Sequence, residues 1–198
     1  MSQWSWIIVA ILVLVIGVGI ALGLMLARRK RSARLRTQFG PEYDRTVGEL
    51  GEQRAAEAEL LAREKKHKKL DIVSLTPEAM QEHASTWARV QAGFVDDPQD
   101  AVGRAERLVT RVMRERGYPI DEFDQRAADV SVDHPDVVEN YRSAHAIYLS
   151  QRDGDISTED ARQAFVHYRA LFERLLARDP DVEAGAHGDE RSQAHDHA

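Results

Sequence analysis

The chain has 198 residues, a formal net charge of −6 and no cysteine. Its first 36 residues carry six cations and no acid, so the rest of the chain carries a net charge of −12, which is −6 minus +6. This acidic balance argues against nucleic-acid binding, which draws most of its affinity from basic surfaces. The lack of cysteine excludes a disulfide framework, a cysteine nucleophile and a lipid anchor on cysteine.

Residues 7–27 form an apolar run without a charged side chain, long enough to span about 30 Å as a helix. This length predicts a single transmembrane helix, with Trp4 and Trp6 before it at the membrane interface. Cations follow the run and none precedes it, which predicts a plasma-membrane protein with its N-terminus outside and its C-terminal domain cytoplasmic. A cleaved signal peptide is the competing interpretation, but it would need cations before the apolar run.

Two features of this region predict contacts. Gly19 and Gly23 form a G-x-x-x-G pair, through which two copies of the helix could associate into a homo-oligomer. The cations after the run could contact headgroups of the membrane lipid bilayer. These cations are Arg28, Arg29, Lys30, Arg31, Arg34 and Arg36.

The remainder of the chain predicts helices only. Residues 43–69 are charged and rich in strong helix formers, which favours one solvated helical spacer. Helix starts at Thr76-Pro77 and Asp97-Pro98, followed by apolar stripes at helical spacing, predict an all-α bundle of about five helices. The expected divisions are a short extracytoplasmic N-terminus (1–6), the transmembrane helix (7–27), a basic juxtamembrane segment (28–42), the spacer (43–69), the bundle (70–178) and a disordered tail (179–198).

Neither a metal nor another cofactor is expected. Residues 153–160 resemble the second half of an EF-hand calcium loop, but the carboxylates of the first half are missing. The segment therefore favours a turn between two helices, with Ser157 or Thr158 as the cap. A diiron bundle would need two Glu-x-x-His pairs, and only Glu64 and His67 have that spacing.

The densest polar cluster surrounds the turn before Pro135. Its acids and histidine could support acid–base chemistry, although acids at the start of a helix are also stabilised by the helix dipole. The candidate site residues are Asp129, Asp133, His134 and Asp136. Because the chain has no nucleophile elbow, P-loop or dinucleotide fingerprint, we predict that it is not an enzyme.

Several segments together resemble a family of uncharacterised bacterial single-pass membrane proteins with a cytoplasmic helical domain. They are FGPEYDRTV at residues 39–47, FVDDP at 94–98, RAADVSVDHP at 126–135 and FVHYRALF at 165–172. The resemblance implies a bacterial origin but no particular activity, cofactor or partner.

The sequence thus predicts a non-enzymatic interaction or scaffold module, tethered to the cytoplasmic face of the bacterial membrane, that docks an unidentified protein partner and no nucleic acid. The alternative is a small-ligand sensor or enzyme with a polar pocket around Asp133 and His134. A third hypothesis is membrane organisation through lipid contacts of the cations at residues 28–36.

Overall fold

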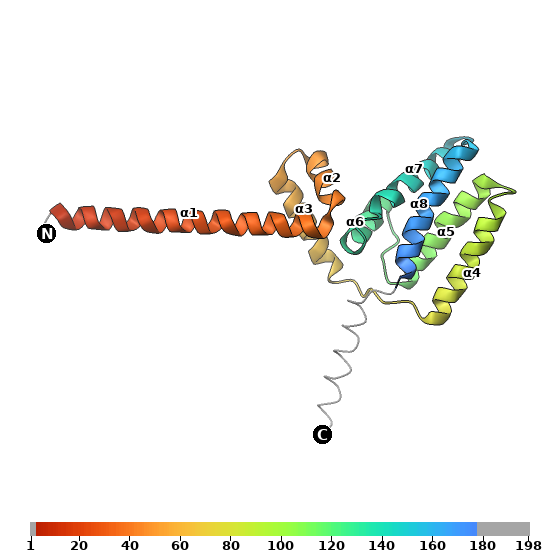
Figure 1. Cartoon of the computed structure of the whole chain (residues 1–198), viewed down its shortest axis with the longest axis horizontal. Coiled ribbons are helices and arrows are strands. Elements are labelled where there is room, and N and C mark those ends of the chain that lie inside the picture. Colours follow the sequence, from red (N-terminus) through yellow and green to blue (C-terminus); the bar gives the residue numbers. More distant parts are fainter. Residues whose placement is uncertain (1–2, 178–198) are drawn as a thin grey trace, which may run out of the picture. The chain divides into compact units, whose positions relative to one another are not determined.

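A computed structural model describes residues 3–177, including the side chains of Leu12 and of residues 14–177 (Figure 1). Eight helices and no strand make up these described residues, which confirms the predicted all-α class. The helices are α1 (Gln3–Phe39), α2 (Pro41–Leu50), α3 (Gln53–His67), α4 (Pro77–Gly93), α5 (Pro98–Glu115), α6 (Phe123–Asp133), α7 (Val138–Asp153) and α8 (Thr158–Leu176). The chain divides into two compact units, residues 1–60 and 61–198. The tail predicted at 179–198 lies outside the described residues, and so do the side chains of Trp4 and Trp6.

The structure of α1 contradicts the prediction of a transmembrane helix. The helix continues unbroken from Gln3 to Phe39, and Arg28 directly follows its apolar stretch. Across the described part of the chain, none of the helices combines the length and the apolar character that crossing a bilayer demands. This finding contradicts the predicted transmembrane helix at residues 7–27 and the predicted single-pass location in the plasma membrane.

The spacer predicted at residues 43–69 is two helices rather than one. Gly51 lies between α2 and α3, adopts φ 69° and donates its N–H to the carbonyl of Val47 (2.9 Å). Because residues with a Cβ are strained at this left-handed φ, glycine here favours the end of α2. Tyr43 then connects the two helices by donating its hydroxyl hydrogen to Glu57 (2.9 Å). The segment is therefore a helical pair, not a continuous rod.

In the second unit, α4 to α8 form a helical bundle (Figure 1). Their apolar side chains form one core. Helix α5 packs against α4, α7 and α8, while α7 also packs against α6 and α8. Trp87 of α4 stacks on two rings of α8, with centroid distances of 4.8 Å to Phe165 and 4.7 Å to Phe172. The predicted apolar stripe of α5 is buried, as Ala101, Val102, Ala105, Leu108, Val109, Val112 and Met113. Burial of this stripe and of the stacked rings supplies the main stabilisation of the bundle.

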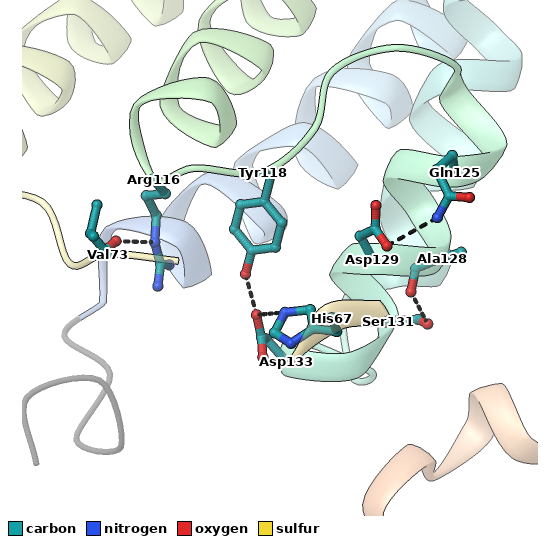
Figure 2. Close-up of polar contacts among 9 residues, drawn as sticks. All are labelled: His67, Val73, Arg116, Tyr118, Gln125, Ala128, Asp129, Ser131 and Asp133. Atoms are coloured by element: carbon teal, nitrogen blue, oxygen red, sulfur yellow. Dashed lines mark hydrogen bonds and ion pairs between the residues drawn. The ribbon is translucent and has the colours of Figure 1, made fainter. Parts of the chain in front are cut away.

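Arg116 attaches the connection before α4 to the ends of α5 and α8. Figure 2 shows its contact with Val73 of that connection. The residue is 1% exposed, and it donates from Nε to the Val73 carbonyl (3.3 Å) and from Nη1 to the Leu175 carbonyl (3.0 Å). The Val73 N–H donates in return to the Arg116 carbonyl (2.9 Å). A cation beside the last carbonyls of α8 also interacts favourably with the dipole of that helix. Arg116 is thus a structural residue of the core.

Candidate functional site

The predicted polar cluster lies at the end of α6 rather than at the start of a helix. Helix α6 continues to Asp133, and the N–H of His134 still donates to the Val130 carbonyl (2.8 Å). Pro135 disfavours helical geometry at His134, which has φ −129° and ψ 57° and so ends the helix. Asp129 and Asp133 are therefore near a helix C-terminus, where the dipole does not favour acids. The helix-start explanation of these acids is wrong, and their stabilisation comes from individual side chains.

Asp133 accepts two hydrogen bonds that join distant parts of the second unit (Figure 2). Its Oδ2 lies 2.7 Å from Nε2 of His67 and 2.5 Å from the hydroxyl of Tyr118, which donates to it. Burial by itself would raise the pKa of Asp133, but the hydrogen bonds with His67 and Tyr118 outweigh burial and hold that pKa below its ordinary value. The carboxylate thereby fastens the end of α3 and the segment after α5 to α6.

The other three cluster residues have different environments. Asp129 is buried, accepts from Nε2 of Gln125 (3.0 Å) and lies 3.9 Å from Nζ of Lys66. Its pKa is raised by burial, which the positive charge of Lys66 offsets only in part. His134 is buried, whereas Asp136 is on the surface, 3.4 Å from Nε of Arg174. The three aspartates thus have separate partners in the fold: His67 and Tyr118 for Asp133, Gln125 and Lys66 for Asp129, and Arg174 for Asp136.

A second polar cluster, inside the bundle, centres on the buried carboxylate of Glu106. Its Oε1 accepts from Thr110 (3.4 Å) and lies 3.8 Å from Nη2 of Arg126 and 3.9 Å from Nδ1 of His145. Burial raises the pKa of Glu106, although Tyr168, Arg126 and Thr110 favour its charged form. Burial and the charge of Arg126 lower the pKa of His145 to about 4. These groups link α5, α6 and α7 and keep His145 neutral at pH 7.

A cationic groove lies between α4 and α5, and we call it the arginine groove. Its cavity measures about 310 Å³ and is lined by Thr86, Arg89, Val90, Arg104, Arg107, Leu108 and Arg111. Arg89 comes from α4, and the other three arginines come from α5. Val90 and Leu108 are buried, while all four arginines are exposed. The groove thus has an apolar floor and guanidinium groups on both walls.

Internal contacts hold part of this charge in place. Nε of Arg104 pairs with Asp100 Oδ2 at 2.5 Å, and Nη2 of Arg107 lies 4.0 Å from Oδ1 of the same carboxylate. Nη2 of Arg89 donates to Oγ1 of Thr86 (2.9 Å). Because a guanidinium has five N–H donors, most donors of the groove stay available to an anion. The arrangement suits recognition of carboxylate or phosphate groups.

The residues predicted to contact lipid or a second helix all lie on α1. Gly19 and Gly23 face open space, since a Cβ at either position would meet no atom within 4 Å. Among the six predicted cations, three line a second pocket in the first unit. These are Arg28, Arg29 and Arg36. Helix association and lipid contact stay predictions.

The segment that resembles part of an EF-hand is a helix-to-helix turn, as predicted. Ser157 caps α8 by accepting from the N–H of Asp160 (3.0 Å), and the Asp160 side chain completes a capping box. Within residues 3–177, no three histidine, aspartate or glutamate side chains come together as a metal site would require.

Comparison with known proteins finds no match: no protein-family model, curated protein or solved structure resembles the chain. The resemblance of its motifs to uncharacterised bacterial proteins is therefore neither confirmed nor contradicted.

The arginine groove was not predicted from the sequence, although the spacing of three of its arginines indicates one of its walls. Arg104, Arg107 and Arg111 recur at i, i+3 and i+7, which places them on one face of α5 beside the apolar stripe. Arg89 joins them only because α4 folds back against α5. The sequence therefore contained one wall of the groove, and the helix pairing supplied the other.

Proposed function

We propose that the helical bundle is a non-enzymatic interaction module that binds an acidic segment of a partner protein in the arginine groove. One observation carries this proposal: four exposed arginines from two helices surround a shared apolar floor. Charge-assisted hydrogen bonds to carboxylates are about twice as strong as neutral ones, and the planar guanidinium favours two-point contacts.

The arginine groove is a cationic surface on an acidic unit of the chain. The second unit, residues 61–198, contains 19 lysine and arginine residues and 27 aspartate and glutamate residues, which is a net charge of −8. Cations gathered on one face of such an acidic domain create a local attraction for an anionic segment, while the acidic parts of its surface repel that segment. The acidic surroundings would therefore direct an acidic partner to the groove.

The lining chemistry favours a protein segment over other anions. The floor of Val90 and Leu108 suits an apolar side chain between two acids. No aromatic residue lines the groove for stacking nucleic-acid bases, and its 310 Å³ is at the small end of the range for ligand pockets. Its titratable lining consists of arginines, which are too basic to serve as general bases at pH 7.

The alternative function, a sensor or enzyme around Asp133 and His134, has less support. Oδ2 of Asp133 already accepts hydrogen bonds from His67 and Tyr118, and both contacts hold elements of the fold together. We therefore favour the interaction module.

Fluorescence anisotropy with the full chain tests the proposal. The probe is a fluorescein-labelled peptide of repeated Glu-Glu-Leu units, compared with the same peptide carrying Gln for Glu. The chain with Arg107→Glu and Arg111→Glu should bind the acidic probe at least about tenfold more weakly. Arg114→Glu with Arg152→Glu is the matched control, because it makes the same charge change at two exposed arginines that do not line the groove.

Wild-type binding of the acidic peptide that weakens with salt and is unchanged in the control would support the proposal. Equal binding by the wild-type chain and the double variant would refute it. Stronger binding of a single-stranded oligonucleotide than of the acidic peptide would also refute it.

A further inference from the structure

A larger pocket lies within the first unit, along α1 and beside the start of α3. It encloses about 700 Å³ and is lined by Ala21, Leu24, Met25, Arg28, Arg29, Ser32, Ala33, Arg36 and Gln53. Most of these residues recur at three- and four-residue intervals, so they form one stripe along α1. The stripe from Ala21 to Arg36 is about 22 Å long. Gln53 of α3 closes its polar end by donating to Ser32 (3.3 Å).

The two ends of this pocket differ in chemistry. One end has exposed apolar side chains, with Leu24 at 57% and Met25 at 48% exposure. The other end has three guanidinium groups together with Ser32 and Gln53. Arg36 is partly engaged, since it lies 3.9 Å from Asp44 and 5.0 Å from the ring centre of Tyr43. Arg28 and Arg29 are exposed, and neither side chain forms an ion pair within the part of the chain that the structure describes.

We infer that this pocket binds an anionic amphiphile, a molecule with a phosphate or carboxylate head and a hydrocarbon tail. The head would lie against Arg28 and Arg29, because guanidinium groups pair with both anion types through charge-assisted hydrogen bonds. The tail would lie along Leu24 and Met25 and remove their apolar surface from water. A free inorganic anion would use only the cationic end, and a neutral amphiphile only the apolar end. This inference is independent of the arginine groove, which belongs to the second unit.

Isothermal titration calorimetry with the full chain tests the inference. The probe is dodecyl phosphate below its critical micelle concentration. Dodecyl maltoside is the comparison with a neutral head, and inorganic phosphate is the comparison without a tail. Arg28→Gln with Arg29→Gln should weaken dodecyl phosphate binding by about tenfold or more, since each cation near an anionic headgroup contributes about fivefold. Lys30→Gln with Arg34→Gln is the matched control, because it removes the same charge from α1 at positions that do not line the pocket.

One-to-one binding of dodecyl phosphate that the pocket variant weakens and the control preserves would support the inference. Equal affinity for dodecyl maltoside, or an equal loss in both variants, would show only adsorption to apolar or charged surface and would overturn it. Equal affinity for inorganic phosphate would overturn it as well, because the tail would then contribute nothing.

Discussion

Gly117 is the position where a single added carbon should damage the fold most clearly. It follows Arg116 at the end of α5 and has φ 92°, a conformation that side chains with a Cβ rarely adopt. A Cβ at this position would lie 2.2 Å from the carbonyl oxygen of Asp71 and 3.2 Å from its carbonyl carbon. Both are backbone atoms, so the connection before α4 would have to move.

The expected cost of Gly117→Ala has two parts. The left-handed conformation costs about 1–2 kcal/mol for alanine. Moving the connection also weakens two hydrogen bonds between Val73 and Arg116. The bond from the charged guanidinium contributes about 1.5–3 kcal/mol to stability, and the backbone bond contributes about 1 kcal/mol. The free energy of unfolding should therefore fall by about 3–6 kcal/mol, which is a large share of the stability of a small domain.

Urea denaturation followed by far-UV circular dichroism measures this change. Gly154→Ala is the matched control, because Gly154 has an extended φ of 175° and open space around it. Gly117→Asn separates the two costs, since asparagine tolerates the left-handed conformation but still carries a Cβ. If the contact with Asp71 dominates, the asparagine variant should be nearly as unstable as the alanine variant. An alanine variant within about 0.5 kcal/mol of wild type would refute the reasoning.

Three further changes test other parts of the second unit. Trp87→Ala removes the ring stacked on Phe165 and Phe172 and should cost about 3–5 kcal/mol in urea denaturation, and a loss under 1 kcal/mol would contradict the packing described. Asp133→Asn should cost about 1–3 kcal/mol at pH 7. Because the pKa of Asp133 is lowered in the fold, its stabilising contribution should be present above the ordinary aspartate pKa and disappear as the pH falls through the lowered value. If Asp133→Asn lost the same stability at all pH values, this expectation would be contradicted. The pKa of His145 is also lowered, to about 4, so the unfolded chain binds its proton first and stability should decrease as the pH falls from about 6.5 to 4. His145→Phe should make urea midpoints less dependent on pH in that window, and an unchanged dependence would exclude His145 as its source.

Local signals in the sequence were reliable for the bundle. The cap at Thr76 accepts from the N–H of Ala79 (3.2 Å), and the cap at Asp97 accepts from the N–H of Asp100 (2.9 Å). The stripe of α5 is buried as its spacing predicted. These features depend on residues within one or two turns of one another, so a linear sequence contains the information that they need.

Features that depend on distant residues could not be predicted in this way. Arg116 is a charged residue that sequence reasoning places on the surface, but its partner Leu175 lies 59 positions further along the chain. Asp133 looked like part of a helix start because its partners His67 and Tyr118 were not apparent. Only the tertiary fold shows that its charge is stabilised by these two side chains.

The polar side chains of the second unit differ in whether their hydrogen bonds are made within the fold or remain available to a ligand. Inside the second unit, Asp133 and Arg116 direct their hydrogen bonds at fixed partners of the same fold, so a ligand could engage them only by breaking those contacts. At the arginine groove the balance is reversed, because four guanidinium groups offer five donors each and the internal contacts with Asp100 and Thr86 use few of them. Keeping like charges together on a surface is unfavourable unless an opposite charge joins them. An acidic segment between α4 and α5 would supply that charge, and this is the physical reason to expect a partner there.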